Sequence, residues 1–142
     1  MIGPEPRLLR RWLNGGAAVL LLAVAAIHGT GLSAVTTALE GRLSLFLFGA
    51  LQAVWLAFSV TGIAVGAMFL AAAAKDGAAP RWVLRVLACI PIACALLIYA
   101  FVGNFIGAHL LLLAGVLGVA SAATRASAAP TTRTRAAQRR CP

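Results

Sequence analysis

The sequence predicts an all-α integral membrane protein, a four-helix transmembrane bundle with both termini in the cytoplasm. Three observations support this prediction: the composition, four long apolar stretches, and the positions of the basic residues. Of the 142 residues, 62% are hydrophobic and 11% are charged, and the mean hydropathy is +0.97. A chain with so few polar residues cannot cover the surface of a water-soluble globule, so we expect the lipid bilayer to be its solvent.

The clearest apolar stretch is residues 45–74, which contains no charged side chain and is interrupted only by Gln52, Ser59 and Thr61. As a helix it would measure about 45 Å, which exceeds the ~30 Å hydrocarbon core of a bilayer. It is therefore predicted to cross the membrane with a tilt, or with its ends among the lipid headgroups.

Three further stretches have the same character, and the expected spans are about 13–33, 45–74, 82–102 and 105–123. A basic N-terminal segment, residues 1–12, precedes the first span. Pro91 lies within the third span and lacks a backbone donor, so we expect a kink there. The pair Gly103-Asn104 allows only a tight turn, which makes the third and fourth spans antiparallel neighbours. Residues 124–142 are rich in Ala, Thr, Arg, Ser and Pro and are predicted to be a disordered, basic cytoplasmic tail.

The basic residues predict the orientation. Of the twelve Lys and Arg residues, only Arg42 falls on the far side of such a four-span chain. Because short cytoplasmic loops are enriched in Lys and Arg, this bias predicts both termini in the cytoplasm and a multi-pass protein of the inner (plasma) membrane. The same distribution argues against a nucleic-acid partner, since the cations flank apolar stretches instead of covering one face. Cleavage of the first span as a signal peptide is an alternative, but three remaining spans would place the basic tail outside.

Glycines on two spans are candidates for helix packing, because small residues let the backbones of membrane helices approach closely. Gly62 and Gly66 form a GxxxG spacing on the second span, and Gly107, Gly115 and Gly118 lie on the fourth. We expect these glycines to pack within one bundle, with a homo-oligomer interface as the alternative.

The candidate binding residues share one depth. His28 lies five residues inside Ser33, whereas His109 and Tyr99 each lie five residues from Asn104. Each is then roughly 7 to 8 Å below the outer surface, and Gln52 on the second span is slightly deeper. Polar side chains at membrane depth tend to face the bundle interior, so these four residues form a hypothetical ligand-binding or cofactor-binding layer.

Two facing imidazoles can ligate a haem iron, and His28, His109 and Glu40 can bind a transition metal. The layer can also hydrogen-bond a quinone or relay protons. The alternative is that these side chains simply link helices.

No phosphate-binding loop, nucleophile motif, Cys-X-X-Cys pair or paired carboxylate accompanies the layer, so no catalytic residue is predicted and the sequence does not indicate an enzyme. The leading functional hypothesis is therefore an accessory or interaction subunit of a membrane assembly, in contact with lipid and with other membrane subunits or copies of itself. The alternative is a haem-, metal- or quinone-binding protein, and a small transporter or channel is a weaker one. The alanine-rich, arginine-rich composition is typical of GC-rich bacterial genomes.

Overall fold

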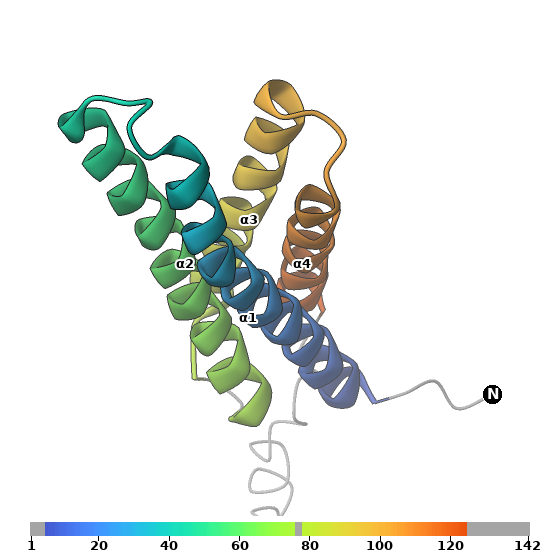
Figure 1. Cartoon of the computed structure of the whole chain (residues 1–142). Coiled ribbons are helices and arrows are strands. Elements are labelled where there is room, and N and C mark those ends of the chain that lie inside the picture. Colours follow the sequence, from blue (N-terminus) through green and yellow to red (C-terminus); the bar gives the residue numbers. More distant parts are fainter. Residues whose placement is uncertain (1–4, 76–77, 125–142) are drawn as a thin grey trace, which may run out of the picture.

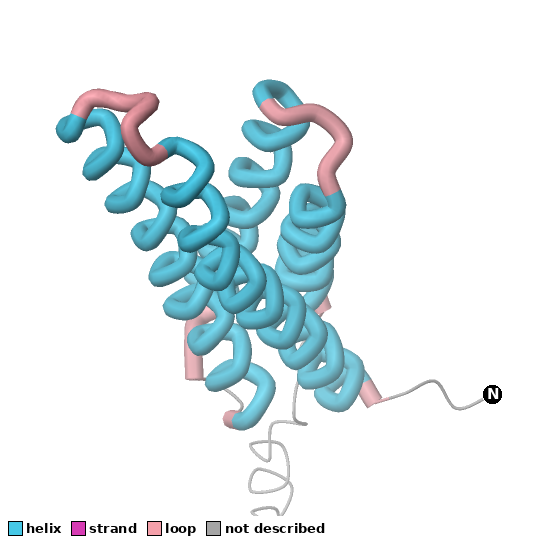
Figure 2. The backbone as a smooth tube through the Cα atoms, viewed as in Figure 1, coloured by secondary structure: helices cyan, strands magenta, loops and turns pink. Residues whose placement is uncertain are grey.

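A computed structural model describes residues 5–75 and 78–124 and contains four helices in them. These are α1 (Pro6–Leu39), α2 (Leu45–Ala74), α3 (Arg81–Phe101) and α4 (Ile106–Ala123), joined by short loops (Figures 1 and 2). Each helix is long and apolar enough to cross a membrane. The prediction of an all-helical chain with four such helices is confirmed, and it indicates a multi-pass membrane protein. The predicted disordered tail lies outside the described residues from position 125 onward.

Helix α1 is longer than the expected first span at both ends. Pro6 occupies the first turn, where its missing N–H would have no helical partner in any case. At the other end the hydroxyls of Thr30 and Thr36 donate hydrogen bonds to carbonyls three residues earlier, so these polar side chains are satisfied within the helix. It ends before Gly41, whose φ of 73° is left-handed and suits glycine. Hydropathy therefore located the apolar part of α1 but underestimated the length of the helix, which begins before residue 13 and ends after residue 33.

We call the end of the bundle that holds Pro6, Ala74 and Ala123 the inner end, and the opposite end the outer end. Helix α1 packs against both α2 and α4, and α3 packs against α4, whereas α2 and α3 scarcely touch. The helices thus follow the spatial order α2, α1, α4, α3, and the ring is open between α2 and α3. Figure 1 shows α2 and α3 diverging toward the outer end.

Helix lengths give a physical reason for this opening. The 34 and 30 residues of α1 and α2 correspond to about 51 and 45 Å, whereas the 21 and 18 residues of α3 and α4 correspond to about 32 and 27 Å. Long helices fit a ~30 Å apolar layer by tilting, and short ones fit it upright. The α1–α2 pair and the α3–α4 pair form two hairpins, and two hairpins with different tilts can pack closely only where they cross.

The core consists mostly of small residues, with Phe69 of α2 as the largest fully buried side chain. A β-carbon on Gly62 would meet Ala25 of α1 at 3.1 Å, and one on Gly66 would meet Leu22 of α1 at 3.0 Å. These two glycines therefore lie against α1 inside the bundle, which leaves no room there for a second copy of the chain.

The glycines of α4 divide into two groups. Gly115 lies against Ile92 and a backbone oxygen of α3, and Gly118 lies against Phe69 of α2 as well as Ala88 of α3. Gly107 has the ring of Phe105, from its own chain segment, as its nearest neighbour. Gly115 and Gly118 thus allow close approach between helices, whereas Gly107 accommodates a local aromatic side chain.

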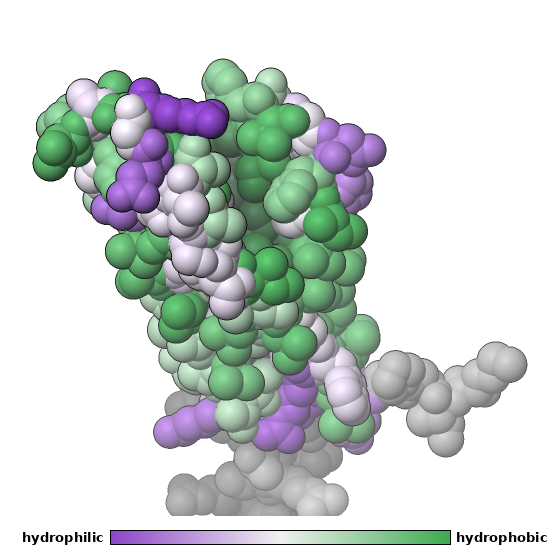
Figure 3. All heavy atoms as spheres, in the orientation of Figure 1, coloured by the Kyte–Doolittle hydropathy of each residue, from purple (hydrophilic) through white to green (hydrophobic). Residues whose placement is uncertain are grey.

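Polar contacts join the helices at the inner end. The side chain of Ser121 on α4 donates a hydrogen bond to the amide oxygen of Asn14 on α1, and Asn14 is only 1% exposed. Arg11 donates to the carbonyls of Ala73 and Ala74, at 3.1 and 3.0 Å, and so caps the last turn of α2. Figure 3 shows that, on the face in view, mostly hydrophobic residues cover the middle of the bundle and hydrophilic residues lie at both ends.

Candidate functional site

His28 packs into an aromatic niche between α1 and α2. Its ring stacks on the indole of Trp55, with centroids 4.1 Å apart and planes 12° from parallel. The ring of Phe58 lies 4.7 Å away and is tilted by 55°. The indole Nε1 of Trp55 donates a 2.7 Å hydrogen bond to the backbone carbonyl of His28. This bond holds the indole ring against the imidazole.

The niche leaves one polar atom of His28 without a partner. Its Nε2 is buried and makes no hydrogen bond to any described residue. A buried polar atom without a hydrogen bond is unusual and costly in an apolar environment. Among the side chains of the predicted layer, Nε2 of His28 is therefore the atom most clearly free to hydrogen-bond a ligand.

His109 lies in a second, separate pair between α3 and α4. Its ring meets the ring of Tyr99 edge-on, with centroids 5.4 Å apart and an interplanar angle of 86°. Its Nδ1 is 3.0 Å from the carbonyl oxygen of Phe105 and donates to it in the tautomer that carries the proton there. His109 is exposed, in contrast to the partly buried His28.

The structure thus brings His109 to Tyr99, and His28 to Trp55 and Phe58. Over the described ranges, no hydrogen bond or ring contact links His28 with His109. Gln52 is half-buried and Glu40 is exposed just beyond α1. Within residues 5–75 and 78–124, no three His, Cys, Asp or Glu side chains are grouped so as to hold a metal ion.

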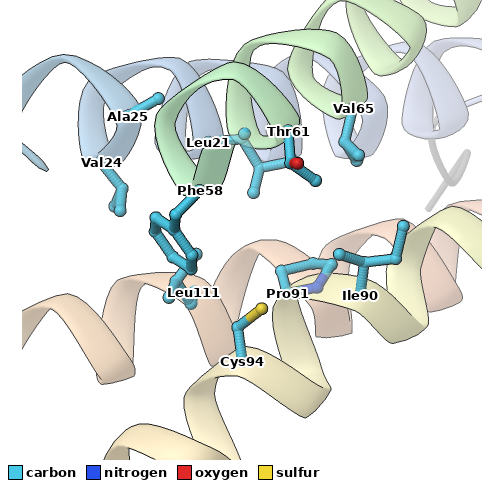
Figure 4. Close-up of a pocket in the computed structure, with 11 residues that line it drawn as sticks. Leu21, Val24, Ala25, Phe58, Thr61, Val65, Ile90, Pro91, Cys94 and Leu111 are labelled. Carbon is cyan, nitrogen blue, oxygen red and sulfur yellow. The ribbon is translucent and has the colours of Figure 1, made fainter. Parts of the chain in front are cut away.

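A cleft in the open side of the bundle lies one turn from the histidine niche. Its empty volume is about 350 Å³, including space open to the surroundings. Helix α2 lines it with Phe58, Thr61 and Val65, and α3 with Ile90, Pro91 and Cys94, while α1 and α4 close its back (Figure 4). The lining is apolar except for the hydroxyl of Thr61 and the thiol of Cys94.

Helical periodicity places further residues on the same faces of α2 and α3 toward the outer end. The α2 lining residues repeat every three or four positions, and the same stripe runs outward through Val54 and Leu47. The stripe of Ile90 and Cys94 on α3 likewise leads to Leu97 and Phe101. Of these four outer residues, Val54 is 69% exposed and Phe101 85%. We call the four residues Leu47, Val54, Leu97 and Phe101 the outer wedge.

Sequence reasoning missed the cleft, the role of Trp55 and the Asn14–Ser121 hydrogen bond. A signal existed for the last of these, because Asn14 is the one amide in the first apolar stretch and such residues usually find partners across helices. No comparable signal existed for the cleft, since its lining looks like ordinary lipid-facing sequence.

We compared the chain with protein-family models, with curated proteins and with solved structures, and none of them matches it.

Proposed function

We propose that the protein is a small accessory subunit that assembles with another membrane protein through the outer wedge. It resides in a bacterial inner membrane with both termini in the cytoplasm, as the distribution of its basic residues favours. Its partner is a transmembrane helix of a different membrane protein.

The open side of the bundle between α2 and α3 is the observation that carries this proposal. Helix α2 packs against a single neighbour, α1, along most of its 30 residues. Membrane helices associate through close packing and hydrogen bonds. The two stripes of the outer wedge diverge and expose large side chains on both walls, which is a shape that a third helix can fill.

The glycines that pack between helices favour a different protein as the partner, and not a second copy of this chain. Gly62, Gly66, Gly115 and Gly118 are already in contact with side chains of the same bundle. The surfaces best suited to close self-association are therefore occupied within one chain.

Site-specific photo-crosslinking in the native membrane tests the proposal. A photoreactive amino acid replaces Val54 or Leu97 on the outer wedge, and Val19 or Val116 serves as an exposed control on α1 or α4. We expect one crosslinked protein of the same mass from both wedge positions and none from either control. A product of twice the 14.6 kDa chain mass would identify a second copy and refute the proposed partner. Protein crosslinks of equal yield at all four positions, or at none, would also refute it.

Optical and metal analysis of the purified protein tests the competing haem and metal hypotheses. A Soret band or stoichiometric metal that disappears in both His28→Ala and His109→Ala would replace the accessory role with a cofactor-binding role.

A further inference from the structure

We propose that the cleft and the His28 niche together form a binding site for an isoprenoid-type quinone, with its chain in the cleft and a ring oxygen on Nε2 of His28. The site shares no residue with the outer wedge, although both lie along the open side between α2 and α3, and its binding of a quinone does not depend on a protein partner.

The two halves of the site lie on one face of α1. Leu21, Val24 and Ala25 line the cleft, and His28 follows them at the next helical repeat on the same side. His28 therefore lies directly beyond the outer end of the cleft, one turn from its last α1 residue.

Phe58 connects the niche to the cleft. Its ring is in contact with the imidazole of His28, at 4.7 Å between centroids, and it also lines the cleft. Figure 4 shows Phe58 pointing from α2 across the cleft toward Leu111. It is the outermost α2 residue of the lining, and it is the residue that the cleft and the His28 niche share.

The chemistry of the site favours an uncharged ligand with a chain and a planar ring. The lining offers mainly carbon, with a hydroxyl at Thr61 and a thiol at Cys94, and no charged residue contributes to it. The unpartnered Nε2 can donate to a carbonyl oxygen or accept from a hydroxyl, according to its tautomer. Trp55 and Phe58 provide aromatic surfaces beside that atom. A quinone or its quinol satisfies each of these features.

The opening of the cleft suits delivery of such a ligand from the membrane. Because α2 and α3 scarcely touch, the cleft opens sideways, where a bilayer would surround the bundle. An apolar ligand dissolved in lipid can enter by that route without crossing water.

Quenching of Trp55 fluorescence tests the proposal directly. The full chain, with Trp12→Phe and Trp82→Phe so that Trp55 is its one tryptophan, is placed in phospholipid nanodiscs and titrated with decylubiquinone. We expect saturable quenching. In His28→Phe, which keeps an aromatic ring but loses Nε2, the dissociation constant should rise roughly 5- to 10-fold, as expected for one lost hydrogen bond.

Three controls separate this site from general partitioning of the quinone into lipid. His109→Phe removes the other imidazole and should leave the titration unchanged. Cys94→Phe fills the cleft and should abolish saturation. Decylbenzene, which has the chain but no carbonyl, should compete with equal strength in the parent chain and in His28→Phe. Quenching that rises linearly with quinone content and is identical in every variant would overturn the proposal, provided that circular dichroism shows each variant folded.

Discussion

Gly118 offers the sharpest test of how this bundle is packed. A β-carbon at this position would lie 2.7 Å from Cζ of Phe69 and 2.9 Å from the β-carbon of Ala88. Phe69 and Ala88 are both fully buried, so neither can move into free space. The substitution Gly118→Ala therefore forces α4 away from α2 and α3.

The size of the effect follows from two opposing terms. Overpacking of a close-packed core costs about 1–3 kcal/mol, whereas alanine in place of a helical glycine contributes up to about 1 kcal/mol in favour of the helix. We expect Gly118→Ala to lower the free energy of unfolding by up to about 2 kcal/mol. Gly49 on α2 is the matched control, because a β-carbon there would meet nothing within 4 Å. Gly49→Ala should therefore leave stability unchanged or raise it by up to about 1 kcal/mol.

Reversible unfolding in mixed micelles of increasing SDS content, followed by tryptophan fluorescence, measures both variants. The decisive quantity is the difference in free energy of unfolding between Gly118→Ala and Gly49→Ala. If Gly118→Ala is as stable as Gly49→Ala, then α4 does not pack against α2 and α3 as described, and the contacts assigned to this glycine are wrong.

Three further predictions concern the polar ends of the bundle. Ser121→Ala should destabilise the fold by about 1–3 kcal/mol in the same unfolding assay, because it leaves the amide oxygen of Asn14 buried without its donor; Asn14→Leu combined with Ser121→Ala should recover most of that loss, and no recovery would contradict this explanation. Arg11→Gln should cost under about 1 kcal/mol, since the side chain is exposed, but it should accelerate amide hydrogen exchange in the last turn of α2; unchanged exchange there would show that the cap has no effect. In a cysteine-free chain, Leu43→Cys should react with a membrane-impermeant maleimide in intact cells and Ala78→Cys only after lysis, and the reverse pattern would refute the proposed orientation.

The candidate site could be predicted from the sequence only in part. Counting residues along a helix gives the depth of a side chain, and that reasoning selected His28, His109, Tyr99 and Gln52. Depth does not give the direction in which a side chain points. In the structure His28 faces α2 and stacks on Trp55, whereas His109 meets Tyr99 of α3, so each histidine belongs to its own hairpin.

The sequence alone determined the number of helices, their class and most of their bounds. The predicted second span, 45–74, has the same limits as α2. The third predicted span, 82–102, is shifted by one residue at both ends from α3, and the fourth, 105–123, begins one residue before α4. This agreement has a simple cause. An apolar stretch long enough to cross a bilayer must form a helix, because only a helix satisfies its backbone polar groups within the same segment. Both conditions depend on the local sequence alone.

Only the tertiary structure decided which helices touch, and so where the cleft lies. Its position depends on the angle between the α1–α2 pair and the α3–α4 pair, which are joined by the contact of Gly118 with Phe69 and by the Asn14–Ser121 hydrogen bond. Those contacts join residues far apart in the chain, and a lipid-facing stretch and a cleft-facing stretch have the same apolar composition. Hydropathy cannot distinguish them, because a neighbouring helix and a lipid tail are almost equally apolar surroundings.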